Sequence, residues 1–210
     1  MVPEANLAAF SLAAVVLIVI PGPSVIFVIG RAMTIGRVGA LLTVAGNALG
    51  MFAQVIAIAA GLGVLLEQSM ILLTIVKFAG AAFLIYLGVQ AIRHRKRAAA
   101  ATSTPRSGRW RSFVEGVGVG VTNPKSIVFF VAVLPQFVDA ATGSIPLQLL
   151  QLGLVFVTLA LACDSVWALA AGAARDWFGR SPRRLSTLGA AGGVAMIGLG
   201  VGLAASGSKA

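Results

Sequence analysis

Six long apolar stretches alternate with short segments that carry charged or turn-forming residues. The apolar stretches cover roughly residues 7–30, 40–63, 69–92, 113–137, 147–172 and 186–206. A bilayer core about 30 Å thick needs about 20 mainly apolar residues in a helix that crosses it. Each stretch meets this length, so the pattern predicts an all-α integral membrane protein with six transmembrane helices.

The composition agrees with lipid as the solvent. Of the 210 residues, 59% are hydrophobic and only 10% are charged, whereas about a quarter of the residues of a soluble domain are charged. Six spans leave only short connections, so we expect one transmembrane domain over 1–210 and no second domain. A single cysteine, Cys163, excludes a disulfide or a thiolate metal cluster within the chain.

The positive charge predicts the orientation. The formal net charge is +10, and most Lys and Arg residues lie in three segments, 31–37, 93–111 and 175–184, which follow the first, third and fifth spans. Because short cytoplasmic loops of membrane proteins are enriched in Lys and Arg, we expect these segments in the cytoplasm and both termini outside. This arrangement accounts for the basic character without nucleic-acid binding.

The two halves of the chain resemble each other in order. Residues 20–24 (Ile-Pro-Gly-Pro-Ser) interrupt the first span, and residues 122–126 (Thr-Asn-Pro-Lys-Ser) interrupt the fourth. Two three-helix repeats, 1–92 and 113–206, joined by the basic loop 93–112, would have opposite orientations. Inverted repeats with interrupted helices in matching positions mark the substrate site of many secondary transporters. The alternative is that the prolines only kink two helices, which membrane helices tolerate.

The interruptions predict a binding site for an anion. Asn123 is a suitable N-cap and Pro124 suits the first helical position, so a new helix should start there within the membrane. Its free N–H groups and positive dipole end could bind a substrate carboxylate. The residues expected to do the same in the first span are Pro21, Gly22, Pro23 and Ser24.

Three ionisable residues lie deep inside the predicted spans, Lys77, Lys125 and Asp164, and Glu115 lies near the cytoplasmic end of the fourth span. A charge in the middle of a bilayer costs about 2.5–3.5 kcal/mol on insertion scales, so these groups either pair with one another or face a polar cavity. In a cavity, Asp164 is the candidate proton carrier, because a buried carboxylate can exchange protons near neutral pH. Asn47 and Gln54 share one face of the second span and either line the cavity or bond between helices.

These residues resemble the LysE/RhtB family of bacterial amino-acid exporters over nearly the whole chain. The matching motifs are Pro21-Gly22-Pro23, Gly36-x2-Gly39, Gly46-x3-Gly50, Lys77-x2-Gly80-Ala81-Ala82-x3-Tyr86-Leu87-Gly88, Asn123-Pro124-Lys125 and Leu134-Pro135-Gln136-Phe137. The resemblance implies six helices, an inner-membrane location and export driven by the proton gradient. The family's substrates include lysine, arginine, threonine, homoserine, homoserine lactone and leucine. The sixth span departs from the pattern in being rich in Gly and Ala.

We therefore expect a secondary transporter that exports amino acids by proton antiport with alternating access, with the amino acid, protons and the bilayer as partners. The glycine-rich helix faces leave a homodimer open, and no cofactor is expected. The alternative is a divalent-cation exporter on a related six-helix fold, which one Asp, one Cys and two lysines disfavour. An intramembrane enzyme is not expected, because the paired groups that hydrolysis needs are missing.

Overall fold

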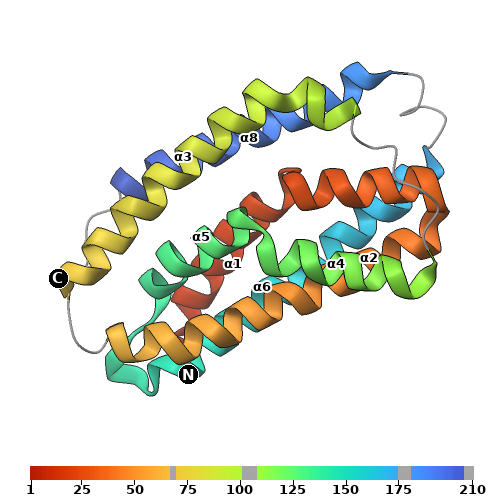
Figure 1. Cartoon of the computed structure of the whole chain (residues 1–210). Helices are drawn as coiled ribbons and strands as arrows, with labels where there is room; N and C mark the ends of the chain where they lie inside the picture. Colours follow the sequence, from red (N-terminus) through yellow and green to blue (C-terminus); the bar gives the residue numbers. More distant parts are fainter. Residues whose placement is uncertain (67–69, 101–107, 175–180, 206–210) are drawn as a thin grey trace.

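The computed structural model describes residues 1–66, 70–100, 108–174 and 181–205, which are helical over most of their length and contain no strand. Figure 1 shows the helices as an elongated bundle. The elements are α1 (Glu4–Val19), α2 (Pro23–Leu66), α3 (Met70–Ala100), α4 (Arg109–Thr122), α5 (Pro124–Ala132), η1 (Leu134–Phe137), η2 (Ala140–Thr142), α6 (Ile145–Ala173) and α8 (Pro182–Ala205).

The two interruptions predicted in the first and fourth spans are confirmed. The helix α1 ends before Ile20, and α2 starts at Pro23, so that the chain bends by 49° between residues 4–19 and 24–33. The fourth span bends by 43° where α4 ends and α5 starts. A proline removes an N–H donor and keeps the residue before it from the helical conformation, and therefore α1 and α4 end shortly before Pro21 and Pro124.

The turn predicted between the first two spans is reduced to one residue. The helix α2 continues through it, with non-helical backbone only at Gly36, whose φ is 83° and ψ is −180°. Glycine adopts a positive φ at little cost because it has no Cβ. Gly36 therefore separates an initial helical segment, 23–35, from the long span that follows.

The basic loop predicted at 93–112 is shorter than expected. Helix α3 continues to Ala100 and α4 begins at Arg109, because alanine, lysine and arginine are strong helix formers. Residues 101–107 lie outside the described part of the chain. The predicted connections at 67–69 and 175–180 lie outside it as well.

Part of the bundle consists of helices that are long and apolar enough to cross a membrane. Among the described residues, Ile35–Gly61 and Ile145–Ala173 are long and apolar enough to cross a membrane, and each of the two bent pairs qualifies if it is counted as one span. The described residues thus contain two to four candidate spans. In α3, the apolar run Phe78–Gln90 is shorter.

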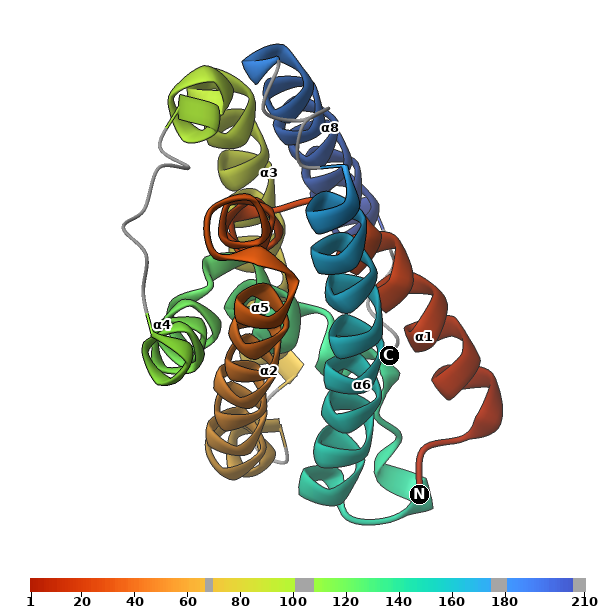
Figure 2. The same ribbon diagram turned by 90° about the vertical axis from the view of Figure 1, so that its right-hand side faces the viewer.

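Glycines set the closest helix crossings. A Cβ added to Gly46 would overlap the Phe113 carbonyl oxygen on α4, and one added to Gly116 would overlap the Thr43 carbonyl oxygen on α2. The small-x3-small patterns in α2 and α4 therefore let the two backbones pack against each other. Figure 2 shows α2 between α4 and α6, and shows α3 beside α8.

The crossing of α3 and α8 is reciprocal. A Cβ added to Gly88 would lie 2.5 Å from the Gly193 carbonyl oxygen, and one added to Gly193 would lie 2.5 Å from the Gly88 carbonyl oxygen. The residue four positions after each glycine, Ile92 or Ile197, packs against the opposite glycine. The last helix of each predicted repeat therefore presents the same surface to the other.

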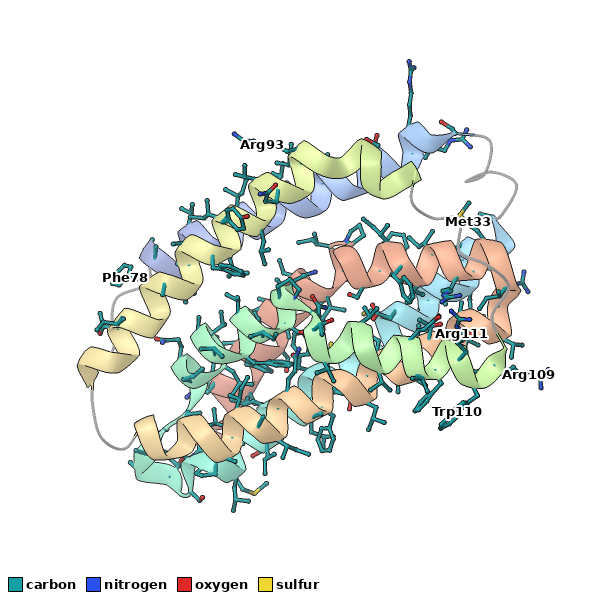
Figure 3. The ribbon with its side chains drawn as sticks, in the orientation of Figure 1. Met33, Phe78, Arg93, Arg109, Trp110 and Arg111 are labelled. Atoms are coloured by element: carbon teal, nitrogen blue, oxygen red, sulfur yellow. The ribbon has the colours of Figure 1, made fainter. Side chains whose placement is uncertain are left out.

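The N-terminus and the arginines at the start of α4 lie at opposite ends of the bundle. At one end, the N-terminus donates from the Met1 nitrogen to the Thr142 carbonyl oxygen at 3.2 Å, and Figure 1 shows the last turn of α8 at this end. Figure 3 shows Arg109 and Arg111 at the opposite end, at the start of α4.

Candidate functional site

The two helix breaks lie against each other in the middle of the bundle. Asn123 is the N-cap of α5, and its side chain accepts a hydrogen bond from the Lys125 backbone N–H at 3.1 Å, with Pro124 in the first turn as predicted. The same side chain donates from Nδ2 to Oγ of Ser24, at 3.3 Å, in the first turn of α2. The starts of both half-helices are thus joined by one buried hydrogen bond.

Lys125 reaches from the second break into the first. Its Nζ donates to the carbonyl oxygens of Leu17 at 2.6 Å and Ile20 at 2.8 Å, at the end of α1. The last carbonyls of a helix lack intrahelical partners, and a cation is favoured at this end of the helix dipole. Gly22 leaves room for the lysine, since a Cβ added there would lie 3.0 Å from Lys125 Cδ.

Gln54 binds the corresponding carbonyls of the second break. Its Nε2 donates to the carbonyl oxygens of Gly120 and Val121, each at 2.8 Å, at the end of α4. Its Oε1 accepts from Oγ of Ser126 at 2.9 Å. Gln54 therefore bonds between helices, which was one of the two roles expected for it.

Asp164 lies on α6 and is only 4% exposed. Its Oδ2 accepts a hydrogen bond from Nδ2 of Asn47 at 3.1 Å. The Oδ1 atom of Asn47 is buried and has no hydrogen-bond partner among the described residues. An unpaired buried acceptor is costly, so this pair can accept a further donor.

These groups surround a small cavity. Its lining consists of Leu17, Ile18, Ser24, Val25, Met51, Asn123, Lys125, Ser126, Phe156, Ala160 and Asp164. The volume is about 20 Å³, which suits about one water molecule. The cavity is therefore small in this arrangement, and its lining includes both a cation, Lys125, and a carboxylate, Asp164.

The two buried charges face the cavity without forming an ion pair. Within the described ranges, the carboxylate in ion pairs is that of Glu115, which contacts Arg31 and Arg111. Lys125 and Asp164 are thus held by backbone carbonyls and by an amide, and not by each other. In this arrangement Lys125 instead joins α5 to the end of α1.

Most of the predicted site residues meet here. Ser24, Asn123, Lys125 and Asp164 line the cavity, and Asn47 binds Asp164. Pro21, Gly22, Pro23 and Pro124 form the two breaks. Lys77 lies in α3, and its side chain lies outside the described part of the structure.

Sequence reasoning missed two kinds of group. The carbonyl oxygens of Leu17 and Ile20 belong to residues whose side chains give no sign of a polar role. Ser126 follows the Asn-Pro-Lys motif, and its position in the first turn of α5 was a usable signal.

The described residues hold no group of three or more His, Cys, Asp or Glu side chains placed to bind a metal ion.

Two sets of contacts lie along the bundle on either side of the two helix breaks. Towards the N-terminal end lies an aromatic cluster in which the ring centroids of Phe130 and Phe156 are 4.8 Å apart and those of Phe10 and Phe137 are 5.5 Å apart. Towards the other end, Arg31 on α2 forms an ion pair with Glu115 on α4.

The family model of the LysE type translocator matches residues 15–207. The chain belongs to this family. The match includes both helix breaks and the aspartate of α6, and therefore covers the whole cavity lining described above.

Several curated relatives match across most of the chain. An uncharacterized membrane protein of Vibrio cholerae is 34% identical over 93% of this chain and 95% of its own length. A homoserine/homoserine lactone efflux protein of Salmonella typhimurium is 31% identical over 93% of this chain and 94% of its own length. An uncharacterized membrane protein of Bacillus subtilis is 32% identical over 74% of this chain. No solved structure matches the chain.

Proposed function

We propose that this LysE type translocator exports zwitterionic amino acids or their close derivatives from the bacterial cytoplasm across the inner membrane. The observation that carries the proposal is the small cavity between the two helix breaks, whose lining includes both Lys125 and Asp164. An amino acid presents a carboxylate and an ammonium on one carbon. A cavity with fixed charges of both signs is complementary to that arrangement.

The substrate carboxylate would bind at the starts of α2 and α5. There, the first-turn N–H groups lack intrahelical acceptors and the dipoles of both helices favour an anion. The Ser24 and Ser126 hydroxyls lie beside these turns. Lys125 adds positive charge to the same wall.

The substrate ammonium would bind at Asp164 and Asn47. This pair offers the two carboxylate oxygens and the Asn47 Oδ1 atom. Among the described residues, one hydrogen bond to these atoms is formed, from Asn47 to Asp164. An ammonium group has three donors and no acceptor. It would therefore use the acceptors that the protein leaves open.

Transport would proceed by alternating access between two inverted three-helix repeats in six spans. Both termini would lie outside and the basic segments in the cytoplasm, which agrees with the position of Met1 and Arg109 at opposite ends of the bundle. Since the cavity has room for about one water molecule, the helices must part to admit an amino acid. The cytoplasmic opening would lie beside Arg31 and Glu115.

The relatives favour particular amino acids as the substrate. A homoserine/homoserine lactone efflux protein is similar over nearly the full length of both chains, which favours homoserine and threonine. Lysine and leucine remain candidates. Coupling by antiport would use Asp164 as the group that carries a proton inward after the substrate ammonium has left it.

Purified protein in proteoliposomes tests the proposal. Labelled homoserine, threonine, lysine and leucine are offered to vesicles that are acidic inside, so that proton efflux drives uptake by antiport. We expect uptake of at least one of these amino acids, and its loss when a protonophore collapses the gradient. Protein-free vesicles are the control. If none of the four amino acids moves in a gradient-dependent way, the proposed function is wrong.

A further inference from the structure

Lys125 occupies a position that its own helix disfavours. It is the second residue of α5, directly after Pro124, where the positive end of the helix dipole repels a cation and favours Asp or Glu. The lysine is also only 6% exposed, and burying a charge without compensation is costly. Something outside α5 must therefore stabilise the ammonium group.

The compensation comes from the end of α1. The carbonyl oxygens of Leu17 and Ile20 accept hydrogen bonds from Nζ at 2.6 and 2.8 Å. Carbonyl oxygens at the interrupted end of a half-helix are the ligands with which transporters coordinate Na⁺ or a proton. Two such oxygens and a negative dipole end form a site for a monovalent cation, and the lysine ammonium fills it.

The backbone around this site is shaped for the lysine stem. Gly22 lies between the two half-helices, and a Cβ there would be 3.0 Å from Cδ and 3.4 Å from Nζ of Lys125. The second break lacks such a cation, because the neutral amide of Gln54 binds the carbonyls of Gly120 and Val121. Among the described residues, the carbonyls at the end of α1 thus bind a charged group, whereas those at the end of α4 bind a neutral amide.

We propose that the end of α1 is a monovalent-cation site of primary-ammonium type, which the chain fills permanently with the tethered ammonium of Lys125. The residue is in this respect a positioning residue: it joins the two helix breaks and supplies the positive wall of the cavity. No free alkali cation is needed at this position. The inference extends the proposed function, but its test below does not depend on any transported substrate.

Replacement by a free amine tests the proposal. Lys125→Ala removes three methylene groups and the ammonium, which correspond to propylammonium. In detergent, we expect the unfolding midpoint to fall by about 5–10 °C, and propylammonium chloride to restore at least half of this loss. Tetramethylammonium, which has the charge but no N–H donor, should restore none.

Two further variants keep the test decisive. Lys125→Met retains most of the stem and lacks the charge, so it should also be less stable than the wild type, and it replaces Lys125→Ala if that variant does not fold. Arg183→Ala removes an exposed cation and should respond to neither amine. Wild-type stability of Lys125→Met, or an equal effect of both amines on Lys125→Ala, would overturn the proposal. A stable, amine-restored protein that carries no amino acid would instead refute only the transport function.

Discussion

The Asp164–Asn47 pair has more acceptors than donors. Asn47 gives one hydrogen bond to Oδ2 of Asp164, while its own Oδ1 atom has no partner among the described residues. Both residues are nearly fully buried, where an unmet acceptor costs about 1–3 kcal/mol. A cationic donor that enters the cavity would therefore complete the hydrogen bonds of this pair. The negative charge of Asp164 can be tested separately from its hydrogen bond to Asn47.

Asp164→Asn is expected to reduce amino-acid uptake into proteoliposomes by about 10- to 100-fold, since a hydrogen bond to a charged group contributes about 1.5–3 kcal/mol. The new amide can still accept from Asn47, so the fold should be retained. Asp139→Asn, which changes a carboxylate in the connection before α6 that caps the Ala141 N–H, is the matched control. Uptake by Asp164→Asn at the wild-type rate would exclude the aspartate from substrate binding and coupling.

At the scale of the elements, α4 shows why its glycines are spaced as they are. Gly116 and Gly120 face α2 so closely that a Cβ would overlap the carbonyl oxygens of Thr43 and Asn47, respectively. Gly118, on the other side of the same helix, has no atom within 4 Å of such a Cβ. Backbone contact at this crossing brings the second break near Asn47.

The substitution Gly116→Ala should therefore lower the free energy of unfolding by about 1–3 kcal/mol, the usual cost of overpacking. The same change at Gly118 should cause no loss, because alanine is the better helix former. Thermal unfolding of both variants in the same detergent compares them directly. Equal stability of the two variants would show that α4 can move away from α2 without cost.

The elements also show what could be predicted from the sequence. The breaks at Pro23 and Pro124 and the N-cap at Asn123 were predictable, because proline and asparagine act on the backbone next to them. The partners of Lys125 were not, since the carbonyls of Leu17 and Ile20 depend on how α1 meets α5. The extension of α3 to Ala100 was missed because its charges were assigned to a loop, although such residues also form helices.

At the scale of the whole molecule, the contacts on the two sides of the helix breaks differ in kind. The end near the N-terminus is packed with phenylalanine rings. The opposite end is joined by the Arg31–Glu115 pair, in which the arginine side chain is 3% exposed and the glutamate side chain 29%. Arg31 lies eight residues after Pro23, and Glu115 eight residues before Asn123, about 12 Å along each helix. The pair thus joins the two half-helices far from their breaks, and water can replace its contacts when it separates.

Breaking the pair should open this end. In a Cys163→Ser background, Ser24→Cys places a thiol in the cavity lining, and a membrane-impermeant thiol reagent reports its accessibility. Arg31→Ala should raise the labelling rate about tenfold, equivalent to about 1.4 kcal/mol. The double variant Arg31→Glu with Glu115→Arg, which exchanges the two charges, should return the labelling rate to its original low value. Arg111→Ala removes the more exposed partner of Glu115 and should have little effect. Unchanged labelling in Arg31→Ala would mean that another contact closes this end.

The reciprocal contact of Gly88 and Gly193 has a consequence for movement. Each glycine lies against the other's backbone in the same way, as equivalent patches do where two identical subunits meet about a twofold axis. Any displacement that separates Gly88 from the α8 backbone also separates Gly193 from the α3 backbone. A relative movement of α3 and α8 at this crossing therefore breaks both contacts together.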